Sequence, residues 1–139
     1  DVDGAAWCWG SNLLDALGTE AHVESTVPAP VDGDHVFTDL ASGQSHTCGL
    51  DDEGSAWCWG RNEDGQVGDG TNDPRPVPTA VSGGHTFTSI GAGLWTTCAL
   101  DTAGDTWCWG LNQFGETGYG EATAFEPTPV KALFPDSGD

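Results

Sequence analysis

The sequence predicts an all-β fold, a partial β-propeller, and three observations support this prediction. A Trp-Cys-Trp string recurs at a fixed spacing, so that Cys8, Cys58 and Cys108 stand fifty positions apart. Glycine is abundant, at 21 of 139 residues, and no segment keeps the apolar period of a helix. Each unit of about fifty residues holds four short runs that suit antiparallel strands, as in a propeller blade.

The chain divides into about 2.7 repeats of this period. Counted from the turn glycine, they are residues 4–53, residues 54–103 and an incomplete third repeat, residues 104–139. Because a blade buries its faces against its neighbours, a stable propeller needs several such units. We therefore expect residues 1–139 to form a single partial propeller domain, an arc whose remaining blades belong to a longer parent chain.

The second repeat shows the expected order of elements. Residues 57–59, Trp-Cys-Trp, predict the first strand, and residues 61–76 predict a loop because they are almost continuous in turn-forming residues. Residues 78–81 contain proline, so they fit an edge strand. The third and fourth strands are expected at residues 87–90 and 97–100, on either side of a Gly-Ala-Gly break.

The last strand of one repeat and the first strand of the next are expected to form a hairpin. Placing Cys48 opposite Cys58 leaves a three-residue loop that ends at Gly54, the position where such loops prefer glycine. The same register places Cys98 opposite Cys108. Directly opposed Cβ atoms lie about 4.5–5.5 Å apart, so both pairs are predicted disulfides. The alternative is that these cysteines are small buried apolar residues of a protein in a reducing compartment.

The predicted disulfides indicate an oxidising compartment, and hence an extracellular or cell-surface location. By the fifty-residue period, the partner of Cys8 would lie before residue 1, so truncation explains the unpaired Cys8, which need not be a reactive thiol. A zinc site is not expected, because no two cysteines have C-x-x-C spacing.

The paired tryptophans lie on the face of the strand opposite to the cysteine. Their recurrence in each repeat favours packing between blades, and a row of aromatic residues that binds carbohydrate is the alternative. The residues expected to pack between blades are Trp7, Trp9, Trp57, Trp59, Trp107 and Trp109.

The charge balance limits the classes of partner. The chain has 22 acidic and 3 basic residues and a net charge of −19, a field that repels phosphate backbones, so nucleic acid is not an expected partner. No stretch approaches the roughly 18 apolar residues of a transmembrane helix, so membrane insertion is not expected. The acidity could attract a basic protein or divalent cations, or it could serve solubility alone.

Residues 46–71, HTCGLDDEGSAWCWGRNEDGQVGDGT, resemble the repeat of the regulator of chromosome condensation (RCC1) family, and in particular its cysteine-containing bacterial versions. The resemblance implies a propeller of about seven blades. The eukaryotic founder of the family is a nucleotide exchange factor for a small GTPase on chromatin, and bacterial relatives include a secreted inhibitor of β-lactamase. The acidic charge argues against a role on chromatin, and the predicted disulfides argue against the nucleus.

The repeats differ from one another just before the cysteine of the fourth strand. Gln44, Ser45 and His46 in one repeat are replaced by Leu94, Trp95 and a threonine in the next. Because aromatic residues are enriched at binding hot spots, these positions are candidates for binding a partner. The alternative is that Leu94 and Trp95 fill a gap between blades.

No catalytic residue, cofactor or metal site is predicted. The histidines stand beside no recognised nucleophile motif, and the acidic pairs lie in turns where acids are common. A calcium site among Asp64, Asp69 and Asp73 is an alternative, but the segment matches neither an EF-hand nor a glycine-rich nonapeptide. We expect a non-enzymatic protein–protein interaction module. A carbohydrate-binding or enzyme-associated propeller is the first alternative, and an exchange-factor-like regulator is the second.

Overall fold

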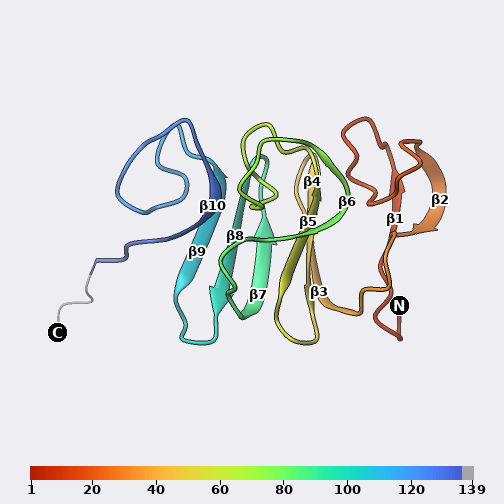
Figure 1. Ribbon diagram of the computed structural model, residues 1–139, viewed down its shortest axis with the longest axis horizontal. Helices are drawn as coiled ribbons and strands as arrows, with labels where there is room; N and C mark the ends of the chain where they lie inside the picture. The colour runs from red at the N-terminus through yellow and green to blue at the C-terminus, as the bar shows by residue number, and fades with distance from the viewer. Residues whose placement is uncertain (136–139) are drawn as a thin grey trace.

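The protein, described by a computed structural model over residues 1–135, consists of three antiparallel sheets that stand side by side (Figure 1). The first sheet pairs β1 (Trp7–Gly10) with β2 (Ser25–Pro30). Each of the other two has four strands. No helix occurs in the described residues, and none of them forms a helix that could span a membrane. The prediction of an all-β fold with four short strands per blade is confirmed.

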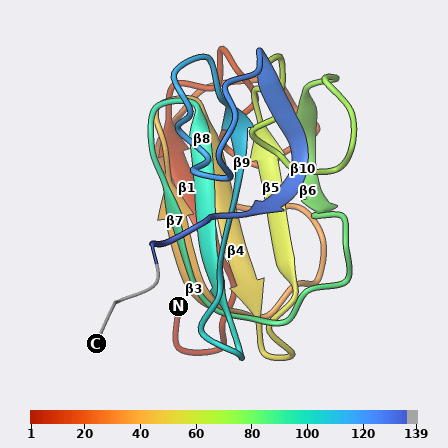
Figure 2. The ribbon, with the colours of Figure 1, turned by 90° about the vertical axis from the view of Figure 1, so that its left-hand side faces the viewer.

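The two four-stranded sheets have the same order, with consecutive strands as neighbours. The second sheet contains β3 (Phe37–Ser42), β4 (His46–Asp51), β5 (Ala56–Gly60) and β6 (Arg75–Ala80). The third contains β7 (Phe87–Ala92), β8 (Thr96–Asp101), β9 (Thr106–Leu111) and β10 (Phe125–Lys131). Figure 2 looks onto the third sheet, in which these four strands follow one another across the view.

A sheet does not coincide with a sequence repeat. β4 closes the repeat of residues 4–53, whereas β5 opens the repeat of residues 54–103, yet the two strands are paired neighbours. Each four-stranded sheet therefore joins the second half of one repeat to the first half of the next. β1 and β2 correspond to β5 and β6, so the first sheet is the outer half of such a unit.

β4 and β5 form the predicted hairpin, with Cys48 opposite Cys58 and a disulfide whose Cα atoms are 4.1 Å apart. The loop ends at Gly54, whose φ of 81° is the left-handed conformation that this loop type requires. β8 and β9 repeat the arrangement with the disulfide between Cys98 and Cys108, again with Cα atoms 4.1 Å apart. Both predicted disulfides are confirmed.

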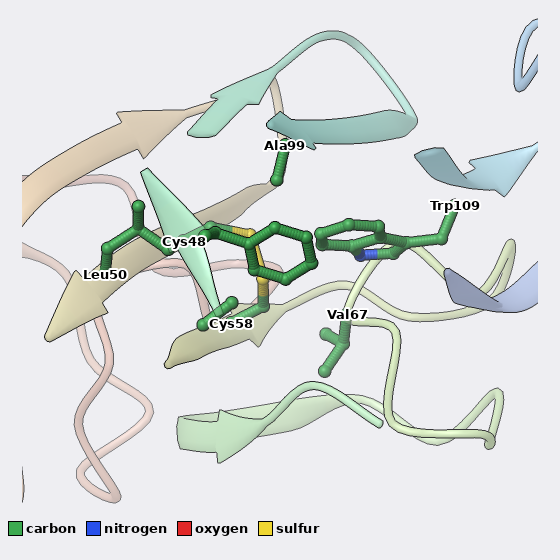
Figure 3. Packing of buried hydrophobic residues seen from close by; sticks show 8 residues of the cluster. Cys48, Leu50, Cys58, Val67, Ala99 and Trp109 are labelled. Carbon is green, nitrogen blue, oxygen red and sulfur yellow. A yellow bond between two sulfur atoms is a disulfide. The ribbon is translucent and has the colours of Figure 1, made fainter. Parts of the chain in front are cut away.

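The core lies between the sheets. β3 and β4 of the second sheet lie against β7, an edge strand of the third sheet. Figure 3 shows the cluster between these sheets, in which Trp109 extends toward Val67 and the disulfide of Cys48 and Cys58. Full burial of one large apolar side chain stabilises a fold by roughly 1.5–3 kcal/mol. Packing between sheets therefore accounts for much of the stability.

Candidate functional site

Each four-stranded sheet is attached to the preceding unit by two donors that share one backbone carbonyl. In the second sheet, the hydroxyl of Thr47 and the indole N–H of Trp59 both donate to the carbonyl oxygen of Ala16, each at 3.1 Å. Thr47 and Trp59 stand opposite each other on β4 and β5, so one cross-strand pair supplies both donors. We refer to this threonine–tryptophan–carbonyl arrangement as the clasp.

The third sheet repeats the clasp. The hydroxyl of Thr97 and the indole N–H of Trp109 donate to the carbonyl oxygen of Gln66 at 2.9 and 3.0 Å. Trp59 and Trp109 are both fully buried. A buried polar group without a partner costs about 1–3 kcal/mol, so the paired donors favour one fixed placement of each sheet on its neighbour.

A glycine makes room for the indole of each clasp. Gly18 and Gly68 have positive φ values of 74° and 81°. A Cβ atom added to them would lie 2.7 Å and 2.6 Å from the indole nitrogens of Trp59 and Trp109. The final glycine of the Gly-Gln-Val-Gly loop is thus required by both backbone conformation and space. Its recurrence at Gly118 is a sequence signal that could have revealed the clasp.

In the second and third Trp-Cys-Trp strings, the other tryptophan packs against a histidine ring that is tilted relative to the indole. The ring of Trp57 lies 4.2 Å from that of His35, and its indole N–H donates to Asp51 at 2.9 Å. Trp107 makes the same contacts, with a histidine ring at 4.0 Å and an aspartate at 2.9 Å. In the third sheet, the indole bond and backbone N–H donors lower the pKa of Asp101. These turn aspartates hold the hairpin loop to the strand that follows it.

A recurring asparagine, which the sequence interpretation missed, organises each long loop. The side-chain oxygen of Asn62 accepts the backbone N–H of Val67 at 3.0 Å, and its amide donates to backbone carbonyls at 3.0 and 2.9 Å. Asn12 and Asn112 accept the equivalent backbone N–H groups. The signal was present in the sequence, because an asparagine follows each Trp-Cys-Trp-Gly string after one residue.

The residues expected to bind a partner lie in the β3–β4 and β7–β8 connections. Leu94 is 60% exposed and Trp95 is 37% exposed, and Gln44 is also exposed. The backbone N–H of Gln44 donates to the carbonyl of Gly93 at 3.4 Å, so the two connections are neighbours. We call Gln44, Leu94 and Trp95 the connection surface.

Ser45 and His46 are buried, which corrects the expectation that their side chains meet a partner. His46 Nε2 lies 2.8 Å from the hydroxyl of Thr97. Since that hydroxyl donates its only proton to Gln66, His46 must donate through Nε2–H. Its Nδ1 has no partner among residues 1–135, and burial lowers the pKa of His46 from 6.5 to about 4. His46 is thus a neutral group in the contact between sheets.

Comparison with models of known protein families shows to which family the chain belongs. Two family models, each described as a regulator of chromosome condensation (RCC1) repeat, match it, one over residues 3–50 and 53–100 and the other over residues 37–66 and 87–116. The chain belongs to the RCC1 repeat family. A comparison with curated protein sequences found no match.

Solved structures share the RCC1 fold over almost the whole chain. Prp20p from Saccharomyces cerevisiae, reported with its binding to Gsp1p and histones, has a TM-score of 0.82 at 21% identity and covers 96% of this chain and 35% of its own. Yeast RCC1 (Prp20) bound to Kap60 gives 0.84 at 22% identity, with 97% and 34% covered. Human WBSCR16 gives 0.82 at 22%, with 95% and 35% covered. The chain therefore spans about a third of the length of these structures.

The first RCC1 unit exposes its tryptophans. Trp7 is 42% exposed and Trp9 is 60% exposed, which corrects the expectation that both pack between blades. The loops that cover Trp59 and Trp109 belong to the preceding unit, through the carbonyls of Ala16 and Gln66, and the described residues contain no such loop for Trp9. Cys8 between them is half-buried and, within that part, unpaired, and burial raises the pKa of its thiol.

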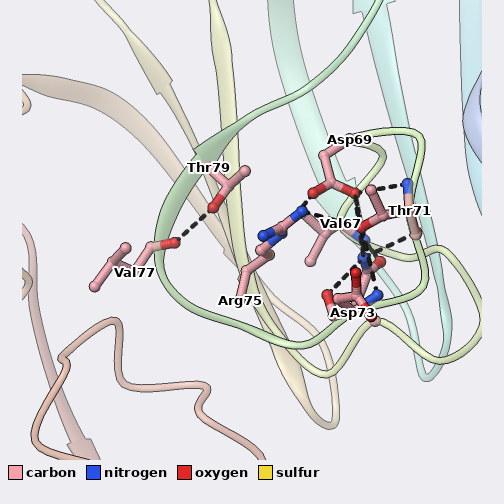
Figure 4. Close-up of polar contacts among 8 residues, drawn as sticks. Val67, Asp69, Thr71, Asp73, Arg75, Val77 and Thr79 are labelled. Atoms are coloured by element: carbon pink, nitrogen blue, oxygen red, sulfur yellow. Dashed lines mark hydrogen bonds and ion pairs between the residues drawn. The ribbon is translucent and has the colours of Figure 1, made fainter.

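The long loop of the second RCC1 repeat contains a partly buried ion pair (Figure 4). The carboxylate of Asp69 accepts from the guanidinium of Arg75 at 2.6 Å and from the hydroxyl of Thr71 at 2.8 Å. Burial acts to raise the pKa of Asp69, but the hydrogen bonds and the positive charge outweigh it and lower the pKa. Asp69, one of the three aspartates of the alternative calcium site, thus already binds a cationic side chain. In residues 1–135, no three acidic, histidine or cysteine side chains gather as a metal site would require.

Proposed function

We propose that this chain is a non-enzymatic arc of an RCC1 propeller that binds another protein through its connection surface. The observation that carries the proposal is the exposure of Leu94 and Trp95. The corresponding position in the preceding connection holds the small, buried Ser45, so the bulky pair is not required by the fold of the connection.

The scaffold suits rigid presentation of this surface. The clasp and the Cys98–Cys108 disulfide hold β8, the strand that follows the β7–β8 connection. A preorganised surface loses less conformational entropy when a partner binds, and a central tryptophan is a frequent hot spot. The net charge of −19 favours a partner with a basic surface, chiefly through faster association. Related structures support a protein as the partner, since Prp20p binds Gsp1p and histones.

We further propose an extracellular or cell-surface location and a longer parent propeller. Two disulfides in a small domain are typical of an oxidising compartment. Thiol titration of the unfolded protein tests this. Without reductant, one of the five cysteines should react, and with reductant all five should. Five reactive thiols in protein purified from its native source without reductant would overturn the proposed location.

The alternative of carbohydrate binding has less support. It needs exposed rows of tryptophan, yet Trp59 and Trp109 are fully buried, and Trp57 and Trp107 are partly buried, each with a histidine ring against it. The most exposed of the six tryptophans are Trp7 and Trp9 of β1.

A photo-crosslinking experiment tests the connection surface. A photoreactive phenylalanine analogue at position 94 should crosslink one protein in a saturable manner from an extracellular fraction of the source. The same analogue at Ala103, in the exposed turn after β8, is the matched control and should not. Equal crosslinking from both positions contradicts the proposal.

The double substitution L94Q/W95S then tests the energetics with the partner found. It introduces the residues that the chain itself carries at Gln44 and Ser45, so the fold of the connection is expected to persist. Loss of a hot-spot tryptophan should weaken binding by at least about tenfold. An affinity within a factor of about two of the original chain would exclude these residues from the interface.

A further inference from the structure

The first long loop, residues 11–24, lacks contacts that the other two long loops make around the recurring asparagine. The amide nitrogen of Asn62 donates to two backbone carbonyls of its own loop, at 3.0 and 2.9 Å. That of Asn112 donates to a carbonyl and a hydroxyl of its own loop, also at 3.0 and 2.9 Å. Asn12 is only 4% exposed, yet its amide nitrogen has no partner among residues 1–135. A buried donor in this loop is therefore left without an acceptor.

A different side-chain contact accompanies this gap. His22 Nδ1 lies 2.6 Å from a carboxylate oxygen of Asp15, which stands where the other two loops have glycine. In the second loop, Asn72 occupies the position of His22 and donates instead to the carbonyl of Glu63 at 2.9 Å. The two loops have the same length and join strands in the same register, so the difference arises within the loop.

The space beside the asparagine is a pocket of about 260 Å³. It is lined by Asn12, Leu13, His22, Val23 and Glu24. Leu13 is 90% exposed and Val23 is 62% exposed. Sites for small molecules usually measure about 300–1,000 Å³, so this pocket is sized for a single side chain of a larger partner.

The pocket does not depend on the units that flank the loop. The partners of the other two asparagine amides lie within their own loops, so a neighbouring unit is not their source. The positions of Leu13 and Val23 are exposed in the middle repeat as well, where sheets flank the loop on both sides (Figure 1). They hold Glu63 and Asp73 there. The exposed apolar pair is thus a property of the sequence of the first loop.

The charge around the pocket favours a basic occupant. Glu24 lines the pocket, Asp15 and Glu20 belong to the same loop, and no lysine or arginine precedes Arg61 in the sequence. This field disfavours a carboxylate, so a neutral carbonyl is the acceptor that best fits the unpaired amide. The apolar wall favours an aliphatic side chain beside that carbonyl.

We propose that the first long loop is a second contact site, separate from the connection surface, for an extended segment of a partner protein. An aliphatic side chain of the partner fills the pocket between Leu13 and Val23. A backbone carbonyl next to it accepts from the amide of Asn12, as loop carbonyls do from Asn62. Flanking lysine or arginine side chains face the acidic residues of the loop.

An NMR titration of the isotope-labelled whole chain tests this site. The probe is the tripeptide Arg-Leu-Arg with both ends blocked, and the controls are Arg-Ser-Arg and Glu-Leu-Glu, blocked in the same way. The leucine peptide should bind in the millimolar range and shift the side-chain amide resonances of Asn12. Because serine cannot fill the apolar pocket, Arg-Ser-Arg should bind at least about tenfold more weakly. Glu-Leu-Glu should also bind more weakly, because its charges are repelled.

A double substitution tests the pocket itself. L13Q/V23T introduces the residues that the chain carries at the same positions of its third loop, so the fold is expected to persist. It should weaken binding of the leucine peptide by at least about tenfold. The matched control is V36T, which changes another exposed valine to the residue that stands at the same position of the next repeat. It should leave the affinity within a factor of about two.

Equal affinities for the leucine and serine peptides would show attraction by charge alone and would overturn the proposal. Equal or tighter binding of Glu-Leu-Glu would overturn it as well. So would the absence of saturable binding, binding that leaves the amide resonances of Asn12 unchanged, or an unchanged affinity in L13Q/V23T. The crosslinking test at position 94 concerns another loop, so the two contact sites can fail independently.

Discussion

Acidification should destabilise the protein through His46 before its carboxylates begin to titrate. The imidazole is fully buried against Thr97, and its Nδ1 faces no acceptor in residues 1–135. Protonation would place an unpaired charge between two sheets. In the unfolded chain, the same imidazole is freely solvated and keeps its ordinary pKa.

The direction and the size of this loss of stability follow from the linkage between proton binding and folding. The folded pKa of His46, about 4, lies below its unfolded value of 6.5, so the unfolded chain binds more protons between these values. The contribution of His46 is therefore fully present above pH 6.5 and is lost as the pH falls toward 4. At about 1.4 kcal/mol per pH unit, the loss reaches about 2 kcal/mol at pH 5 and about 3 kcal/mol at pH 4.

Urea unfolding at several pH values, followed by tryptophan fluorescence, measures this loss. The matched variant is H46T, because Thr96 occupies the corresponding position in the next repeat. The variant is expected to be less stable at pH 7, but its stability should fall by about 2 kcal/mol less between pH 7 and pH 5. Parallel stability curves for the two proteins, within about 0.5 kcal/mol, would refute the assignment of the pH dependence to His46.

Two further predictions concern the clasp, and both are read from the free energy of unfolding in urea. G68A should lower the free energy of unfolding by at least about 2 kcal/mol, because the added Cβ would meet the indole of Trp109. G104A is the control, since Gly104 has a similar φ but open space around it, and this substitution should cost only about 1 kcal/mol. Equal losses for the two variants would contradict the close contact. W109F should cost roughly 1–3 kcal/mol through the lost indole donor and smaller ring, whereas W9F should change stability by less than about 0.5 kcal/mol because Trp9 is exposed. A similar loss in both would place the stabilisation outside the clasp.

The hairpin and its disulfide could be predicted from the sequence because they are local. The position of Gly54 determines the loop type, the loop determines the register, and the register places Cys48 opposite Cys58. None of these steps requires knowledge of another blade. The offset between repeat and sheet follows from the same pairing, since the hairpin crosses the repeat boundary.

Roles that depend on a neighbouring unit could not be predicted in the same way. Trp57 and Trp59 share a strand and a face, and they differ in their neighbours: the ring of His35 packs against Trp57, whereas Trp59 donates to the carbonyl of Ala16. The repeat spacing therefore predicted that both tryptophans pack between blades, but it did not predict which contacts each of them makes.

The change from Ser45 to a tryptophan in the next repeat likewise showed that the position varies, but it did not show whether the side chain there is buried. Ser45 is buried, whereas Trp95 is partly exposed. The difference depends on contacts between connections that are fifty residues apart, which a single sequence does not display.

The hairpin disulfides have a consequence for proteolysis. The turn residues Asp52 and Glu53 are exposed and lie between Cys48 and Cys58, so a protease that cuts there opens the backbone inside a covalent ring. The two pieces would remain joined through sulfur and would separate on a gel only after reduction. A hairpin nicked at this exposed turn would thus keep its two strands together.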